Sequence, residues 1–137
     1  MKILVVHRQK EVDKQVKSVL CLNTSIIRFC DSGLDGLLAS RIEQFDLIIC
    51  STELPVVTGF EMVRSLRTGS LNKHTPVVFL TDEISAEMRQ LGEALGAMDM
   101  FSASEIGEKL PEILFEKIKE TPDHSWEDLL TIKHRMN

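Results

Sequence analysis

Short apolar runs alternate along this chain with longer segments that carry apolar residues at helical spacing. The runs are rich in β-branched residues and are bounded by polar or turn residues: ILVV at 3–6, SIIRF at 25–29, DLIIC at 46–50, PVVFL at 76–80 and a weaker MDMF at 98–101. Continuous apolar strands of this kind are typical of a parallel sheet buried on both faces. Because parallel strands need crossover connections and the intervening segments look helical, the pattern predicts a doubly wound α/β domain.

The connecting segments have apolar residues three and four positions apart, the spacing of helices that pack one face on a core. These residues are Val12, Val16, Val19 and Leu20; Leu34, Leu37, Leu38 and Ile42; Phe60, Met62, Val63 and Leu66; Met88, Leu91 and Leu95; Ile113, Leu114 and Ile118. We expect Gly96 to end the fourth helix. Pro111 fits a first helical turn but not an interior, so we expect the last core helix to start near Lys109 or to be kinked there.

The length of 137 residues and the apolar content of 43% suit one compact domain, which we place at 1–120. The tail at 121–137 has a capping-box pattern at Ser125 and Asp128, followed by an apolar stripe of Trp126, Leu129 and Leu130. It predicts a short amphipathic helix that packs back on the domain or starts a linker. A surface for a partner or a dimer is the alternative.

Charge and cysteine content exclude several classes of protein. The net charge is −5, from 16 basic and 21 acidic residues without a long run of either sign, so we expect no binding to nucleic acid or membrane. The N-terminal MKILVV is too short for a signal peptide or a membrane span, which favours a cytoplasmic protein. Cys21, Cys30 and Cys50 have no CxxC spacing, so we expect reduced, buried thiols.

Functional groups in such a sheet gather at the carboxyl ends of its strands. His7 and Arg8 follow the first run, Ser51 follows the third and Thr81 follows the fourth. Together with the segment after Phe101, these residues are the candidates for a site.

Several segments taken together resemble the response-regulator receiver domain, the CheY-like phosphoacceptor module of two-component signalling and phosphorelays. They are KILVV, DLIIC with the Leu54-Pro55 loop and Gly59-Phe60-Glu61, TPVVFLTD, and LGAMDMF, so the resemblance runs from Lys2 to about Lys119. It implies a flavodoxin-like, five-stranded parallel sheet of order 2-1-3-4-5 with helices on both faces.

The chain departs from this family at the positions that carry its chemistry. Receivers hold Mg²⁺ with an acidic pair after the first strand, accept a phosphoryl group on an Asp at the end of the third, and pair it with a Lys. The resemblance puts His7 and Arg8 at the acidic pair, Ser51 at the acceptor, Ala103 at the Lys and Ser104 at the Pro that usually follows. It therefore implies a degenerate receiver.

Two further positions of the family form its switch. Thr81 retains the switch hydroxyl, whereas the switch aromatic falls on Met100. A register one residue later would instead place Phe101 there.

We expect no Mg²⁺ and no other cofactor at such a site. Mg²⁺ prefers hard oxygen ligands, and these positions supply an imidazole, a guanidinium and hydroxyls. A divalent ion about 4 Å from Arg8 would be repelled by roughly 8 kcal/mol at an effective dielectric constant of about 20. The sequence shows no nearby carboxylate that would offset this repulsion.

A Ser/His pair is geometrically conceivable, because His7 and Ser51 would lie on neighbouring strands at one level. No GxSxG elbow, orienting acid or Gly-rich oxyanion turn accompanies them, however. We therefore expect no enzyme, and a Ser51 that is hydrogen-bonded to Thr81 or to the backbone.

Arg8 has two interpretations. In the first, it turns outward or pairs with Glu53 or Glu11. In the second, it joins His7 in binding a phosphate or carboxylate ligand. The remaining histidines, His74, His124 and His134, stand at polar positions, and we expect them to be solvated.

These observations favour a pseudo-receiver that acts through protein contacts without phosphorylation of an aspartate. The resemblance assigns its contacts with a histidine kinase or a downstream effector to residues 85–119, and a homodimer is a further option. Two alternatives remain: phosphorylation at Ser51 or another residue, and a small anion bound at the mouth formed by His7, Arg8 and Ser51.

Overall fold

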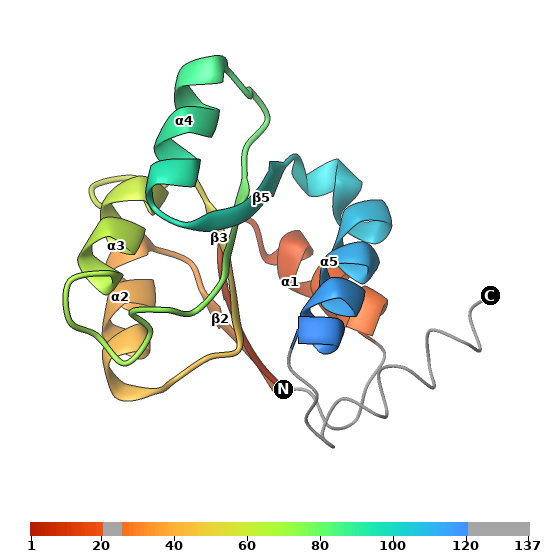
Figure 1. Ribbon diagram of the computed structural model, residues 1–137, viewed down its shortest axis with the longest axis horizontal. Helices are drawn as coiled ribbons and strands as arrows, with labels where there is room; N and C mark the ends of the chain where they lie inside the picture. The colour runs from red at the N-terminus through yellow and green to blue at the C-terminus, as the bar shows by residue number, and fades with distance from the viewer. Residues whose placement is uncertain (21–25, 121–137) are drawn as a thin grey trace.

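The computed structural model describes residues 1–20 and 26–120, and strands alternate with helices throughout them (Figure 1). The strands are β1 (Lys2–Val6), β2 (Ile26–Cys30), β3 (Leu47–Ser51), β4 (Val77–Leu80) and β5 (Ala97–Phe101). The helices are α1 (Lys10–Leu20), α2 (Gly33–Ile42), α3 (Gly59–Leu66), α4 (Ala86–Ala94) and α5 (Ile106–Glu120), with a short 3₁₀ turn, η1 (Ala103–Glu105), before α5. The predicted tail helix, with Trp126, lies outside the described residues.

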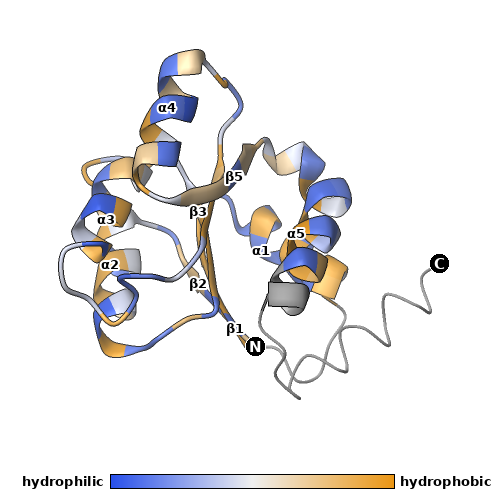
Figure 2. Cartoon of the chain, in the orientation of Figure 1, coloured by the Kyte–Doolittle hydropathy of each residue, from blue (hydrophilic) through white to orange (hydrophobic). Residues whose placement is uncertain are grey.

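All five strands are parallel and lie in the order β2-β1-β3-β4-β5, which confirms the predicted α/β sheet. Helices α1 and α5 cover one face, and α2, α3 and α4 lie on the other (Figure 1). The central strands β3 and β4 are buried along their whole length. Figure 2 shows the apolar strands enclosed between helices whose outer sides are largely hydrophilic.

Hydroxyl side chains begin three of the helices. The Ser32, Thr58 and Ser85 hydroxyls accept hydrogen bonds from the amides of Asp35, Glu61 and Met88 at 3.1, 3.2 and 3.2 Å. Each bond satisfies one of the amide groups that a helix leaves free at its first turn. The helix starts are therefore set by local sequence.

Helix α2 packs in a way that its apolar pattern does not predict. Its buried residues are Gly33, Gly36, Ala39 and Ser40, and Gly36 lies so close to the sheet that an added Cβ would stand 2.8 Å from Val6 and from Met62. This close approach needs small side chains, so Leu34, Leu38 and Ile42 face solvent with 55, 53 and 76% of their surface exposed. The prediction that Leu34, Leu38 and Ile42 pack on the core is wrong, whereas Leu37 of the same predicted stripe does pack against it.

Of the two alternatives for the last helix, the start near Lys109 is wrong and the kink there stays a prediction. Helix α5 begins at Ile106, so Pro111 lies inside it. Pro111 cannot donate to the carbonyl of Gly107, which is exposed and can bond to water instead. The prediction for Gly96 is confirmed, because it follows the C-cap of α4 with a φ of +79°.

Two polar side chains hold the long loop between α3 and β4. Arg67 donates to the carbonyls of Leu95, Thr75 and Lys73 at 2.9, 2.7 and 3.1 Å. Asn72 is fully buried and makes four hydrogen bonds, to Phe45, Thr75, Ser40 and Glu43. The loop is thereby tied to the end of the sheet opposite the candidate site.

The cysteine prediction is confirmed for one residue. Cys50 is buried, whereas Cys30 is only half-buried and Cys21 lies outside the described residues. In the described part of the chain, no helix is both long and apolar enough to cross a lipid bilayer.

Candidate functional site

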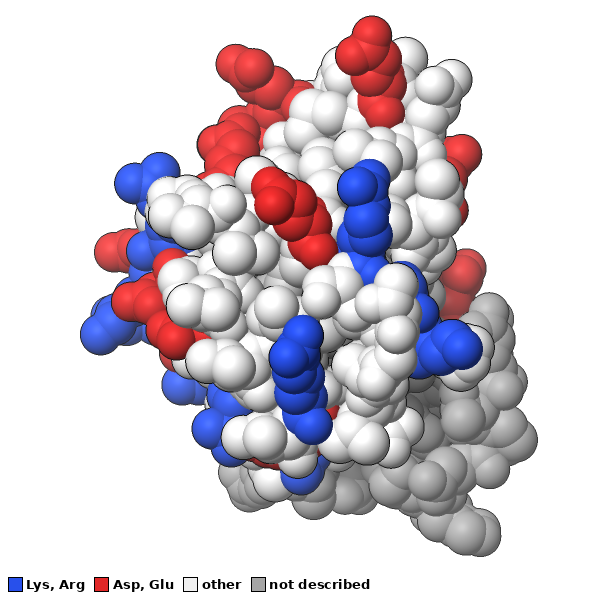
Figure 3. Space-filling model, turned by 90° about the vertical axis from the view of Figure 1, so that its left-hand side faces the viewer, with Lys and Arg blue, Asp and Glu red and all other residues white. Residues whose placement is uncertain are grey.

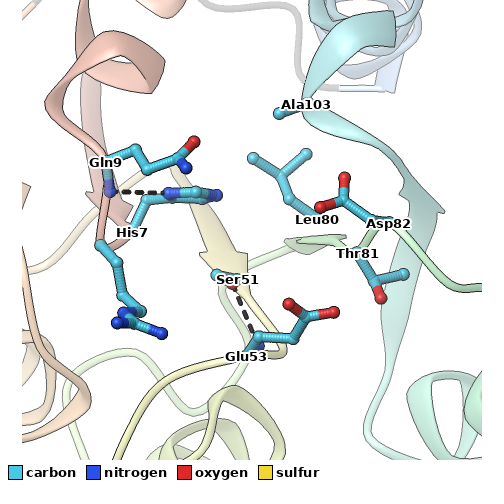
Figure 4. A pocket seen from close by; sticks show the side chains of 9 residues that line it. His7, Gln9, Ser51, Glu53, Leu80, Thr81, Asp82 and Ala103 are labelled. Atoms are coloured by element: carbon cyan, nitrogen blue, oxygen red, sulfur yellow. Dashed lines mark hydrogen bonds between the residues drawn. The ribbon is translucent and has the colours of Figure 1, made fainter.

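A pocket of about 330 Å³ opens at the carboxyl ends of β1, β3 and β4, beside the start of η1 (Figure 4). It brings together all five residues that the sequence assigned to the phosphoacceptor site. Its lining is His7, Arg8, Gln9, Ser51, Glu53, Leu80, Thr81, Asp82 and Ala103.

The ends of the strands position these side chains. The pairs Val6–Cys50 and Ser51–Leu80 bring His7 to the level of Ser51 and place Thr81 one residue beyond it. The amides of His7 and Thr81 extend the ladder by donating to the carbonyls of Cys30 and Phe101 at 3.1 and 3.0 Å. The floor of the pocket is therefore rigid backbone.

His7 is held in its neutral form. Its Nδ1 accepts a hydrogen bond from the Gln9 amide at 3.0 Å (Figure 4), which leaves the ring proton on Nε2. Burial lowers the pKa of His7 below the usual 6.5, and Arg8 lowers it further, whereas Asp82 opposes the shift. A neutral His7 with a protonated Nε2 offers the pocket a hydrogen-bond donor rather than a base.

This shift in pKa predicts a pH dependence of stability. The unfolded chain takes up a proton at His7 near pH 6.5, and the folded protein takes it up only at lower pH. The free energy of unfolding should therefore fall as the pH drops through 6.5 and level off below the folded pKa. Urea unfolding at about pH 7.5 and about pH 5.5 should show a smaller fall for His7→Gln than for the wild type.

The matched control is His74→Gln, which replaces an exposed histidine outside the pocket. Its loss of stability between the two pH values should equal that of the wild type. An equal loss for His7→Gln and His74→Gln would contradict the assignment.

Ser51 is 4% exposed, and its hydroxyl accepts a hydrogen bond from the Glu53 amide at 3.0 Å (Figure 4). This confirms the expected backbone bond. Thr81 bonds instead to the backbone of Glu83, at 3.3 Å. Within residues 1–20 and 26–120 no hydrogen bond joins Ser51 to His7, so Ser51 is not arranged as a base-activated nucleophile.

Arg8 is exposed at the mouth of the pocket. The expected ion pairs with Glu53 and Glu11 do not form, and among the described residues Arg8 has no ion-pair partner. Its outward orientation agrees with the first interpretation, in which Arg8 turns outward, but without the ion pair to Glu53 or Glu11.

Glu53 and Asp82 bring two carboxylates into the lining, so the expectation that none lies near Arg8 is wrong. Sequence reasoning also missed Gln9 as a lining residue. For the two carboxylates the sequence did show their closeness to predicted site residues, because Asp82 directly follows Thr81 after β4 and Glu53 stands two residues after Ser51.

The donors of the pocket do not fit the Mg²⁺ site that the fold family implies. Arg8 and the Nε2–H of His7 occupy the end of β1, and the end of β3 offers the Ser51 hydroxyl. In the part of the chain that the structure describes, no three His, Cys, Asp or Glu residues gather as a metal site. Mg²⁺ needs oxygen ligands in near-octahedral geometry, and a guanidinium repels it.

A register shift between β4 and β5 decides on which face of the sheet Met100 and Phe101 lie. The shift lies between Val77 and Val78, and beyond it Phe79 pairs with Met100 and Leu80 with Phe101. Met100 therefore packs on the α3–α4 side, whereas Phe101 packs with α1 and α5. Met100 is 5% exposed, and its assignment to the switch position stays a prediction.

The remaining candidate positions lie at or beyond the rim. Ala103 lines the pocket with a methyl group only, and Ser104 is exposed with its hydroxyl 2.7 Å from that of Ser102. His74 is exposed, as predicted, and His124 and His134 lie outside the described residues.

Comparisons with known proteins agree with this fold. The model of the response regulator receiver domain family matches residues 3–114. Chemotaxis protein CheY-3 of Vibrio cholerae is 30% identical over 125 residues, which cover 86% of this chain and 94% of that protein. The structure of Vibrio cholerae CheY4 is similar with a TM-score of 0.75 and 31% identity, over 84% of this chain and 96% of that one.

The transcriptional regulatory protein CusR of Escherichia coli is 35% identical over 99 residues, which cover 72% of this chain but 43% of CusR. The chain thus spans less than half the length of that regulator. The family match over most of the chain, the strand order and the pocket at the strand ends agree. The chain belongs to the response regulator receiver domain family of two-component signalling.

Proposed function

We propose that this receiver domain signals through protein contacts, without phosphorylation of an aspartate. The observation that carries the proposal is the chemistry at the end of β3. The side chain that lines the pocket there is the hydroxyl of Ser51, which accepts the Glu53 amide. A neutral, buried hydroxyl is a poor phosphoryl acceptor without a base beside it.

The rest of the pocket supports this proposal. Phosphoryl transfer depends on metal ions and cationic groups that neutralise charge as it develops. Ala103 offers no cation where the family has Lys, and Glu53 and Asp82 would repel an incoming phosphate. The same two carboxylates count against the alternative of a small-anion site, although the unpaired Arg8 favours it.

The proposed contacts with a histidine kinase or a downstream effector use residues 85–119. Helix α4 supports this surface, because Gly92 is its only buried residue and the helix projects from the body of the domain (Figure 1). Ile84 and Met98, 38 and 37% exposed, flank it with apolar surface. In this proposal the domain is cytoplasmic, has no enzymatic activity or cofactor, and binds neither nucleic acid nor membrane.

Incubation with acetyl phosphate and Mg²⁺, followed by intact-mass measurement, tests the proposal. The wild-type mass should stay unchanged, because the side chain at the end of β3 is a hydroxyl and no three His, Cys, Asp or Glu residues of the described part gather as a metal site. A quadruple variant, His7→Asp, Arg8→Asp, Ser51→Asp and Ala103→Lys, should gain one phosphoryl group and serves as the positive control.

Ser51→Ala separates the alternatives. A phosphoryl adduct on the wild type that Ser51→Ala abolishes would make Ser51 the acceptor and overturn the proposal. An adduct that persists in Ser51→Ala would also overturn it and would indicate another acceptor, which peptide mapping would locate.

A further inference from the structure

Helix α2 presents an apolar stripe that the described part of the domain leaves uncovered. Leu34, Leu38 and Ile42 stand four residues apart and therefore share one side of the helix. Between 53 and 76% of each side chain is exposed. Single exposed aliphatic residues are ordinary, but a row of three on one helix is a feature of interaction surfaces.

The apolar surface continues beyond the helix. The carbonyl of Val57 lies directly against Gly33, so the β3–α3 loop adjoins the first turn of α2. Val56 in this loop is 96% exposed, and Ile26 at the start of the edge strand β2 is 57% exposed. Figure 3 views this side of the molecule, where large areas carry neither acidic nor basic side chains.

The fold does not need the stripe. Helix α2 is anchored by its small residues, and Gly36 could not be larger without displacing Val6 or Met62. Polar residues at 34, 38 and 42 would leave these contacts unchanged. Helices without a partner carry polar residues on such a face.

The charged residues beside the stripe have opposite signs at its two ends, so they are complementary to those of a second copy of the helix. Asp35 stands three residues before Leu38, in the first turn of α2, and Arg41 stands three residues after it, in the last turn. Both are exposed, and neither has an ion-pair partner within residues 1–20 and 26–120. The acidic end of the helix is thus matched by a basic end at the same distance from Leu38.

This symmetry selects an antiparallel arrangement. When two α2 helices pack antiparallel about a two-fold axis at Leu38, Leu34 of each copy meets Ile42 of the other. Asp35 of each copy then lies at the level of Arg41 of the other, and the helix dipoles oppose one another favourably. A parallel pair would instead place like charges side by side.

We propose that α2 is a dimer surface on which a second copy of this chain packs antiparallel, centred on Leu38. The apolar area is small, so the dimer belongs with the weak interfaces, which bury less than about 1,200 Å² in total. The inference goes beyond the proposed function and does not depend on the phosphoacceptor site. It leaves residues 85–119 free for other partners.

Sedimentation velocity of the full chain over a wide range of concentrations tests the proposal. The wild type should shift reversibly from monomer to dimer as the concentration rises. Leu38→Glu should stay monomeric, because the two-fold axis brings two glutamates against each other. Ile84→Glu is the matched control, since Ile84 is 38% exposed and precedes α4, outside the stripe, and it should dimerise as the wild type does.

Exchanging the charges gives a second measurement. Asp35→Arg and Arg41→Asp should each raise the dissociation constant of the dimer by about tenfold, because both symmetric pairs become repulsive. The double variant should return it to within about threefold of the wild type. Urea unfolding midpoints verify that each variant is folded.

Three results would overturn the proposal: a wild type that is monomeric at every concentration, equal dimerisation of Leu38→Glu and Ile84→Glu, or a double variant as weak as its single parents. Since none involves acetyl phosphate, failure here leaves the proposed function standing, and failure of that function leaves the dimer standing.

Discussion

Replacing Asn72 with alanine is expected to lower the free energy of unfolding by about 3 kcal/mol. Asn72 is fully buried and uses all the bonding capacity of its amide group. Its Oδ1 accepts from the Phe45 amide at 2.8 Å and from the Thr75 hydroxyl at 3.0 Å. Its Nδ2 donates to the carbonyls of Ser40 and Glu43 at 2.6 and 2.8 Å.

The loss is large because alanine leaves buried partners without bonds. The carbonyl of Ser40 and the amide of Phe45 would lose the bonds that the Asn72 side chain supplies, and burying an unsatisfied polar group costs about 1–3 kcal/mol. The fall should be seen in urea unfolding at constant m-value.

Two variants make this test specific. Lys73→Ala changes the exposed neighbour of Asn72 and should alter stability by less than about 0.5 kcal/mol. Asn72→Asp keeps the shape but turns the Nδ2 donor into an acceptor facing two carbonyls, so it should be at least as destabilising as alanine. A neutral Asn72→Ala would show that the loop repacks and that these bonds contribute little.

Replacing Gly59 with alanine is expected to cost about 2–3 kcal/mol. Gly59 is the first residue of α3, and an added Cβ would collide with the backbone carbonyl of Ser51. Neither group can rotate away, because Ser51 belongs to the central strand β3 and Gly59 follows the Thr58 cap. The substitution must therefore move α3 away from the floor of the pocket.

Gly107→Ala is the matched control, with the opposite expected sign. An added Cβ at Gly107 would meet nothing within 4 Å. Because alanine favours the helix and restricts the unfolded chain, it should stabilise the domain by about 0.5–1 kcal/mol. Destabilisation of the same size by both substitutions would contradict the steric explanation for Gly59.

Much of the fold was accessible from the sequence. Apolar runs without polar alternation predict the central strands because β3 and β4 are covered on both faces, and MDMF was sufficient for β5. The strand order came from the resemblance to receivers and is confirmed. Hydroxyl caps such as Ser32 are local, so their positions are readable from neighbouring residues alone.

The two errors in the helices share a physical cause. Leu34 and Leu38 have the spacing of a buried helix face. The closest approach to the sheet, however, is made by Gly36, which has no side chain and so adds nothing to the apolar pattern. Pro111 favours a helix start near Lys109. Ile106 and Leu110 are buried, however, and their packing makes the helix begin about one turn earlier, at Ile106. Tertiary packing overrode the local preference in both places.

The residues of the candidate site also divide into those that the sequence predicted and those that it did not. His7, Arg8, Ser51 and Thr81 were predicted together because the carboxyl ends of parallel strands meet at one edge, and the resemblance to receivers added Ala103. Asp82 was missed and Glu53 was named only as a possible partner of Arg8. Both stand within two residues of a predicted site residue, but whether a loop side chain turns into a pocket depends on the backbone of that loop.

By itself, the sequence determined the parallel α/β sheet and the hydroxyl of Ser51 at the end of β3, since both follow from residue type and order along the chain. Only the tertiary structure decided that Met100 rather than Phe101 faces α4 and that Leu38 faces solvent. Successive residues of a strand point to opposite faces, so one shifted residue in β5 exchanges the two side chains. Likewise, the side of α2 that packs is chosen by how closely its backbone can approach Val6.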